Sequence, residues 1–538
     1  MECRSNHILS QRTRLMALKN GYASVLFLAV FAAVALAIFS LYDTGIVASE
    51  RIRMQNTADN VAYSTATMVT RDMNIIAITN RAMVANQVAI GQMVALASWA
   101  NMVQEFAGNL ETLGDFAQVI PYVGKLIEQI TEIVYKATTQ LKNIIQNFGN
   151  KFILAEDKLI GLLYSMQAAN HEMTLLSGKI IYDDIIAKND SDVSANALST
   201  VYNIQSFIKA YKGHTQYNKR DNIKNKMLSA QRFAEMANTV NDSRDKMMAN
   251  RAYNVIPKIT VVPWPVRLKF WGPKYGGTDY VMSKKNNKYL WSWTSLDTFS
   301  LWWSYRYPKK LFGWKTHTSE LLPLGWGAAH ALNKELNTTQ YNYDSRKKVL
   351  ESKFEQNNWN EINYNNGSKI SAWGASYKNK NAADLVKYPT LLQGEKKGDI
   401  YNNIKDVDGI KQFIDLKSND RTTDGPMFSV LLSKGEDKLR TQKTIDSTNA
   451  SYNRTNQFSI EENGGIPGDK VYALASAQSY FSRPDESLSG NSNKEWMITW
   501  GRKDGLKEYG NLYNPFWQTR LQKNNDNIIQ LLLTLGKL

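Results

Sequence analysis

The sequence has almost no cysteine, since Cys3 is the only one in 538 residues. An intramolecular disulfide, a thiolate-bound zinc cluster and a cysteine-based redox site are therefore excluded. The five histidines are scattered, and none belongs to a zinc-protease helix motif. The sequence also has no nucleophile elbow, phosphate-binding loop or dinucleotide fingerprint. We therefore predict a protein that is not an enzyme and needs no cofactor.

Proline and tryptophan are nearly missing from the first half of the chain. Only one of the twelve prolines and one of the fourteen tryptophans occur before residue 257. A proline-poor stretch with apolar residues three and four apart is typical of helices, whereas short aromatic runs broken by proline and glycine are typical of strands. The predicted fold class is α+β, with a helical stalk or bundle over residues 43–250 and a β-rich mixed α/β distal region over 251–538.

The composition, with 43% hydrophobic and 21% charged residues, excludes both a disordered chain and a polytopic membrane protein. The apolar spacing predicts helices at about 44–110, 118–147, 152–188, 194–212 and 221–250. Aromatic and β-branched runs predict strands at 258–264, 267–271, 289–293, 301–307, 426–433 and 471–481. We expect the Asn-, Lys- and Gly-rich stretches 334–380 and 434–470 to be surface loops or insertions.

Only one hydrophobic run is long enough to cross a membrane. Residues 21–42 carry no charged side chain, and a helix of this length spans about 30 Å of hydrocarbon. Four basic residues lie in the leader at 1–20, and Asp43 and Glu50 follow the run, so the positive-inside rule predicts a cytoplasmic N-terminus. A cleavable secretory signal is the alternative, but its apolar region is usually shorter.

A short polar motif follows this run. Asp43 and Gly45 come first, and then the segment at 50–72 contains Met54, Gln55, Asn56, Ala58, Asp59 and Ala62. Together with the apolar helix, this pattern resembles the N-terminal region of the TadG-like (TadE/G-like) proteins of Flp pilus assembly, over about residues 20–75. Val61 departs from the small residue that the family pattern has there.

The resemblance implies a single-pass protein of a bacterial inner membrane, with the region after residue 43 in the periplasm. It implies a non-enzymatic part in a Tad/Flp-type pilus assembly system, with partners such as TadE-like pseudopilins. Gly21 and Tyr22 are similar to a prepilin peptidase site, but Leu26 stands where pilins have glutamate. We therefore expect the leader to be retained.

The polar motif predicts a face for a partner helix. Small residues permit close approach of two helices, and amide groups fix the register. The predicted face consists of Gln55, Asn56, Ala58, Asp59, Asn60 and Ala62. In the alternative interpretation, these polar side chains face solvent or cap local turns.

A metal site has one weak candidate. Some TadG-like proteins carry a von Willebrand factor A domain, whose Asp-x-Ser-x-Ser string binds Mg²⁺ at the end of a strand. Asp485, Ser487 and Ser489 match this string, but Pro484 and Gly490 flank it, and such common residues match by chance. We therefore predict no metal site, and we keep a metal-dependent adhesive domain as an alternative.

Eight tryptophans between Trp264 and Trp326 lie among many basic residues. Aromatic faces beside cations can stack on sugars and bind anionic groups, and the candidates for this are Trp291, Trp293, Trp302 and Trp303. The net charge of +16 lies mostly beyond residue 190. An anionic polysaccharide is therefore the partner in our second hypothesis, a surface or periplasmic binding module, and we do not expect nucleic acid. A β-rich core with aromatic cross-strand pairs is the structural alternative.

Overall fold

The computed structural model describes most of the chain. The described residues are 3–117, 145–193, 197–220, 227–249, 251, 253–262, 266–285, 288–309, 313–333, 339–344, 349–354, 362–363, 401–404, 407–417, 421–435, 438, 470–483 and 506–524.

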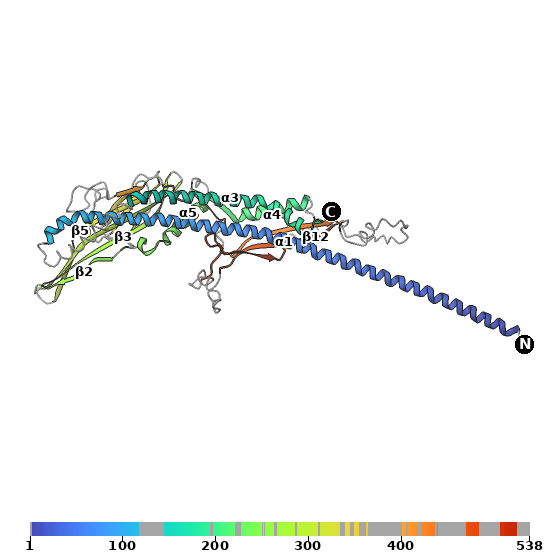
Figure 1. Cartoon of the computed structure of the whole chain (residues 1–538). Coiled ribbons are helices and arrows are strands. Elements are labelled where there is room, and N and C mark those ends of the chain that lie inside the picture. The colour runs from blue at the N-terminus through green and yellow to red at the C-terminus, as the bar shows by residue number, and fades with distance from the viewer. Residues whose placement is uncertain are drawn as a thin grey trace.

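The long helix α1, Cys3–Ala117, organises the molecule. Its N-terminal part extends away from the body, and its remaining length runs through the body (Figure 1). Nearly all side chains from Tyr22 to Tyr42 are exposed, whereas one face of the helix is buried from Met54 onward. The helix expected at 44–110 is confirmed, and it continues without a break from the apolar run because no proline interrupts it.

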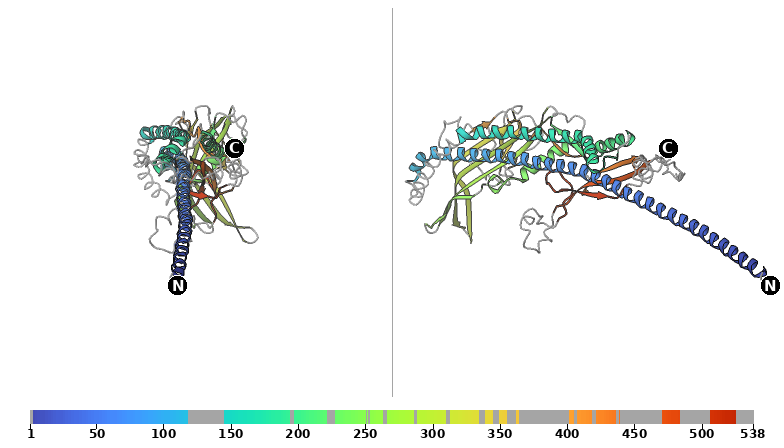
Figure 2. Two further views of the ribbon diagram at one scale, coloured as in Figure 1. Left: turned by 90° about the vertical axis from the view of Figure 1, so that its right-hand side faces the viewer. Right: turned by 45° about the vertical axis from the view of Figure 1, so that its right-hand side comes forward.

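Further helices and one short strand follow α1 in the chain. They are η1 (Ile145–Gly149, a π-helix), α3 (Asn150–Asn189), α4 (Ala197–His214), β1 (Thr215–Lys219), α5 (Met227–Asp242) and α6 (Lys246–Ala249). The helix α3 runs back along α1 in the opposite direction, toward the projecting end (Figures 1 and 2). The helices expected at 152–188, 194–212 and 221–250 are found with shifted ends, and most of 118–147 lies outside the described residues.

A five-stranded sheet covers the far part of α1, with strand order β2-β3-β4-β5-β9. Its strands are β2 (Tyr253–Val261), β3 (Arg267–Lys285), β4 (Lys288–Pro308), β5 (Trp314–Leu332) and β9 (Tyr401–Ile404). All neighbours are antiparallel except β5 and β9. The strands expected at 289–293 and 301–307 are parts of the single strand β4, and no separate strand was expected for β5.

The prediction of surface loops at 334–380 is wrong for three short segments. The strands β6 (Thr339–Asp344), β7 (Val349–Phe354) and β8 (Ile362–Asn363) form an antiparallel sheet of their own. The stretch 334–380 is rich in Asn, Lys and Gly, which are depleted in strands, so its composition does not mark these segments.

The last strands return to the part of α1 nearest its projecting end. The strands β11 (Asp424–Gly435), β12 (Lys470–Phe481) and β13 (Trp517–Gln522) form one antiparallel sheet, and β10 (Gln412–Leu416) pairs with β1. This sheet shares a core with Met54, Ala58 and Ile76 of α1. Residues 251–538 are therefore not one distal region, because their C-terminal strands lie beside the start of the stalk.

Three hydrophobic cores of the described residues follow one another along α1. The first joins residues from Met54 to Ile76 with α3, α4 and the β11–β13 sheet. The second joins Met83 to Ala100 with α5, Trp293 and Phe413. The third joins Met102 to Phe106 with the sheet of β2 to β5. Both halves of the sequence contribute to each core, so the predicted division near residue 250 does not separate two structural units.

Candidate functional site

The predicted partner face lies where α1 enters the folded body. Ala58 and Ala62 are fully buried in the core shared with the β11–β13 sheet. The Gln55 amide donates to Asp59 Oδ1 at 2.9 Å and to the Leu474 carbonyl at 3.0 Å. The small residues of the motif are therefore used for close approach within the chain itself, and they are not accessible to a second helix.

The exposed edge of the same segment remains open to a partner. Asn56 is exposed, and Asn60 is exposed while its amide donates to Asn189 Oδ1 at 3.0 Å. Ile52 and Tyr63 are 63% and 46% exposed on the same side of the helix. We call Ile52, Asn56, Asn60 and Tyr63 the entry stripe. The prediction of a partner-helix contact is retained for this stripe.

A buried ion cluster fixes the entry of α1 into the body. Lys434 Nζ lies 2.8 Å from Glu50 Oε2 and 3.2 Å from Asp190 Oδ2, and all three residues are at most 6% exposed. The cluster of Glu50, Asp190 and Lys434 joins α1, the end of α3 and β11. Because burying three charges is favourable only when they are paired, the cluster holds these elements in one arrangement.

Buried polar side chains fasten α1 to the other elements along its length. The Asn80 amide donates to the carbonyls of Ile414 and Leu512, at 2.9 and 2.8 Å. Asn74 pairs with both backbone groups of Trp517. The sequence analysis did not identify these residues as functional. The sequence feature that could have identified them is an amide side chain on the apolar face of a predicted helix. Such a side chain is costly to bury unless it is hydrogen-bonded.

Asp72, His171 and Thr215 form a buried chain of hydrogen bonds. His171 Nδ1 lies 2.8 Å from Asp72 Oδ2, and His171 Nε2 lies 3.3 Å from Thr215 Oγ1. The Tyr211 hydroxyl also donates to Asp72. The order of carboxylate, imidazole and hydroxyl is the order of a catalytic triad. However, none of the three residues is more than 7% exposed, and the Thr215 hydroxyl donates to the Tyr211 carbonyl, so a substrate has no access.

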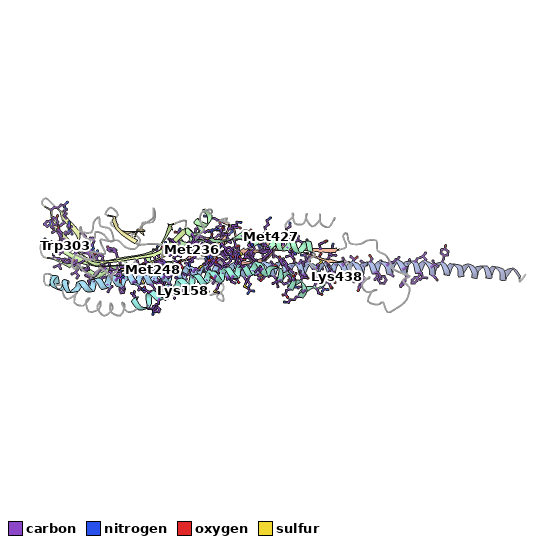
Figure 3. All side chains as sticks on the ribbon, turned by 90° about the horizontal axis from the view of Figure 1, so that it is seen from above. Lys158, Met236, Met248, Trp303, Met427 and Lys438 are labelled. Carbon is purple, nitrogen blue, oxygen red and sulfur yellow. The ribbon has the colours of Figure 1, made fainter. Side chains whose placement is uncertain are left out.

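Aromatic side chains form rows on both faces of the β3–β4–β5 sheet. On one face Trp271 and Trp302 stack at 6.3 Å between ring centroids. On the other, Tyr305 lies 5.0 Å from Trp303, 5.6 Å from Tyr307 and 5.0 Å from His317. Most of these rings are only partly buried, and Figure 3 shows Trp303 at the end of the body far from the projecting helix.

Cations lie over two tryptophan rings of the same sheet. Lys258 Nζ is 5.7 Å from the Trp271 centroid, and the Arg306 guanidinium is 5.2 Å from the Trp314 centroid. Trp314 is 50% exposed. A partly exposed ring with a neighbouring cation can contact both the face of a sugar and its anionic substituent.

The four tryptophans predicted to stack on a ligand are not equivalent. Trp302 and Trp303 lie in these rows and are partly buried, so stacking on a ligand stays a prediction for them. Trp293 is only 1% exposed, packs on Tyr280 and donates to Gln87 Oε1, so it belongs to the core and the prediction for it is wrong. The strand that carries Trp291 is described, but its side chain lies outside the described residues.

Within the described residues, no three histidine, cysteine or acidic side chains are grouped so that they could hold a metal ion. Asp485, Ser487 and Ser489 lie outside the described residues.

Among the residues that the structure describes, α1 contains the one helical stretch, near the N-terminus, that is long and apolar enough to cross a membrane. No protein-family model, no curated protein and no solved structure matches the chain.

Proposed function

We propose that this protein is a non-enzymatic, membrane-anchored component of a Tad/Flp-type pilus assembly system in the inner membrane of a Gram-negative bacterium. The observation that carries the proposal is the position of the Tad-like motif. It lies on one continuous helix, directly after an exposed apolar stretch, where the helix enters the first buried core of the body. The N-terminus is cytoplasmic and the body lies in the periplasm in this proposal.

The entry stripe is where another assembly component would bind. It combines two apolar side chains with two amides, and it lies within a few turns of the proposed membrane surface. Another single-span protein, such as a TadE-like pseudopilin, leaves the membrane as a helix at the same height. Contacts between helices near the membrane therefore need no flexible arm in either protein.

A complementation experiment in a strain that lacks this protein tests the proposal. The wild-type chain should restore pilus assembly, and Asn56→Trp should not, because a bulky ring blocks close approach of a partner helix. Ile78→Trp is the control, since Ile78 is 55% exposed on the same helix but further from the proposed membrane. The proposal fails if the wild-type chain has no effect on pili, or if the two variants restore them equally.

A second function, binding of an anionic polysaccharide, is favoured by the aromatic rows. The observation is the Arg306 guanidinium over the half-exposed Trp314. Heparin is a suitable probe for the full chain in detergent. Wild type should bind heparin with an affinity that falls as salt rises, and the double variant Trp302→Ala/Trp314→Ala should bind it more weakly. Tyr472→Ala, on the β11–β13 sheet, should bind heparin as wild type does. Equal binding by all three proteins would contradict this second function.

A further inference from the structure

The outer face of α3 presents an apolar row that nothing in the described chain covers. The row is exposed from 40% at Leu159 to 75% at Leu176. Its members follow one another at alternating intervals of three and four residues, and we call them the α3 seam: Leu159, Leu162, Met166, Ala169, Met173, Leu176 and Ile180. A spacing of 3.5 residues is that of the a and d positions of a coiled coil.

The opposite face of α3 is already used within the chain. Ile160 is in the second core, Gln167 donates to Asn80 and Thr79, and His171 contacts Asp72. The helix is therefore apolar on its outer side in addition to the side that holds it to α1. An ordinary surface helix has a polar outer side, so the seam is unexplained by the fold of one chain.

The seam extends for about three heptads. At about 1.5 Å per residue, Leu159 to Ile180 covers roughly 33 Å. Upstream of Leu159 the row is not continued, because Phe152 packs against the second core. Apolar a and d positions sustained over this length are typical of coiled coils.

We propose that the α3 seam pairs with the α3 seam of a second copy of this chain, as a parallel, in-register coiled coil. A helix that pairs with this seam must itself have exposed apolar residues at heptad spacing. Among the described helices outside the apolar stretch of α1, only α3 has such a row. A two-fold dimer brings this row onto itself, which satisfies both copies with one surface. Figure 3 labels Lys158, which directly precedes Leu159 of the seam.

The parallel orientation of the two helices rests on the membrane anchor proposed above. The seam itself is observed in one chain and does not depend on that anchor. Two copies anchored in one membrane have the same direction, and α3 runs back toward the projecting end of α1 in each (Figure 1). In a parallel pair, Leu176 of one copy meets Leu176 of the other. In an antiparallel pair with a and d positions matched, Leu176 would instead meet Leu159.

Disulfide formation in native membranes tests the arrangement. Cys3→Ser removes the only cysteine, and Leu176→Cys then places one thiol in the seam. We expect a disulfide-linked dimer of Leu176→Cys on mild oxidation, and none for Arg421→Cys, which is exposed outside α3, between β10 and β11. The proposal is overturned if Leu176→Cys stays monomeric, links to another protein, or forms a disulfide only when mixed with Leu159→Cys.

Sedimentation of the full chain in detergent gives an independent test. Wild type should dimerise, and Leu162→Glu with Leu176→Glu should weaken dimerisation about 100-fold, because it places like charges in an apolar seam. Its circular dichroism spectrum should match that of wild type, since both side chains are exposed in one chain. Dimers of unchanged strength, or a monomeric wild type, would refute the seam. Pilus complementation is measured separately, so failure of the dimer is distinguishable from failure of the proposed function.

Discussion

Asp297 is a fully buried carboxylate that joins three elements. Arg251 Nη2 lies 2.8 Å from its Oδ2, Lys274 Nζ lies 2.5 Å from its Oδ1, and Ser98 of α1 donates to Oδ2 at 2.7 Å. Burial alone would raise the pKa of Asp297, but the two cations hold it below its ordinary value. One carboxylate thus pairs with two buried cations and ties α1 to the large sheet.

Asp297→Asn should destabilise the protein by about 3–5 kcal/mol, because it leaves Arg251 and Lys274 buried without a counter-charge. Urea unfolding followed by circular dichroism measures the change. Asp184→Asn is the matched control, since Asp184 pairs with Lys188 on the surface, and such a pair contributes about 0–1 kcal/mol. Similar losses in the two variants would mean that the buried cluster is unimportant for stability.

Asp415 should make the protein less stable as the pH rises from about 4 to 6. Burial raises the pKa of Asp415 to about 6, although Arg232 lowers it in part. In this range the folded state keeps a proton that the unfolded state releases, so the free energy of unfolding falls with rising pH and levels off above about 6. The total change is on the order of 2–3 kcal/mol.

Asp415→Asn removes this titration and is the comparison that isolates it. Thermal unfolding of both proteins across pH 4 to 7 should show wild type losing stability relative to the variant as the pH rises. A constant difference, or a wild type that gains stability relative to the variant, would contradict the assignment.

At the scale of elements, most helices were predictable from the sequence, whereas many strands were not. The three- and four-residue spacing marks α1 and α3 in the sequence, although α1 continues to Ala117, past the end expected at about residue 110. In β4, Ser295 and Asp297 are polar but buried, so local alternation fails where the strand meets α1. In β5, Pro323 lies at a register shift, which hides the strand from pattern analysis.

The predicted partner-helix face was only partly correct, because local sequence pattern does not show which side of a helix is buried. Local pattern marked the motif from Gln55 to Ala62, but it could not show which side faces the chain's own sheet. That information lies in β12, about 400 residues further along the sequence, whose Leu474 carbonyl accepts from Gln55. The aromatic rows were predictable as strands, whereas the burial of Trp293 depends on α1.

Gly91 on α1 should not tolerate a side chain. A Cβ there would lie 2.5 Å from Met248 Cε and 2.8 Å from the Trp293 ring, so Gly91→Ala should destabilise by about 1–3 kcal/mol. Gly161→Ala on α3 is the matched control, because nothing lies within 4 Å, and it should stabilise by about 0.5–1 kcal/mol. Urea unfolding of both variants checks the two signs, and a stabilised Gly91→Ala would contradict this close contact.

At the scale of the whole molecule, the protein is a long rod with one projecting helix (Figures 1 and 2). The C-terminal strands lie beside the start of the rod, so its base depends on both ends of the sequence. Pattern analysis gave the helical first half and the strands of the second, but this return of the chain has no local signal. It arises from pairing over several hundred residues.

The proposed topology predicts that everything beyond residue 43 is periplasmic. An alkaline phosphatase fused after residue 60 should be active, because phosphatase folds only where its disulfides form. A cytoplasmic reporter at the same position should be inactive, since basic residues precede the apolar stretch and acidic residues follow it. The reverse pair of activities would mean that the chain is inserted in the other direction.

The central claim is that the entry stripe contacts another pilus-assembly protein, and photo-crosslinking in living cells tests it most directly. A photoreactive residue at Asn56 should give a crosslinked product that mass spectrometry identifies as a small single-span assembly component, such as a TadE-like pseudopilin. The same residue at Ile78, further along the exposed side of α1, should not give this product. Crosslinks at Asn56 to lipid alone, or to proteins unrelated to pilus assembly, would contradict the account.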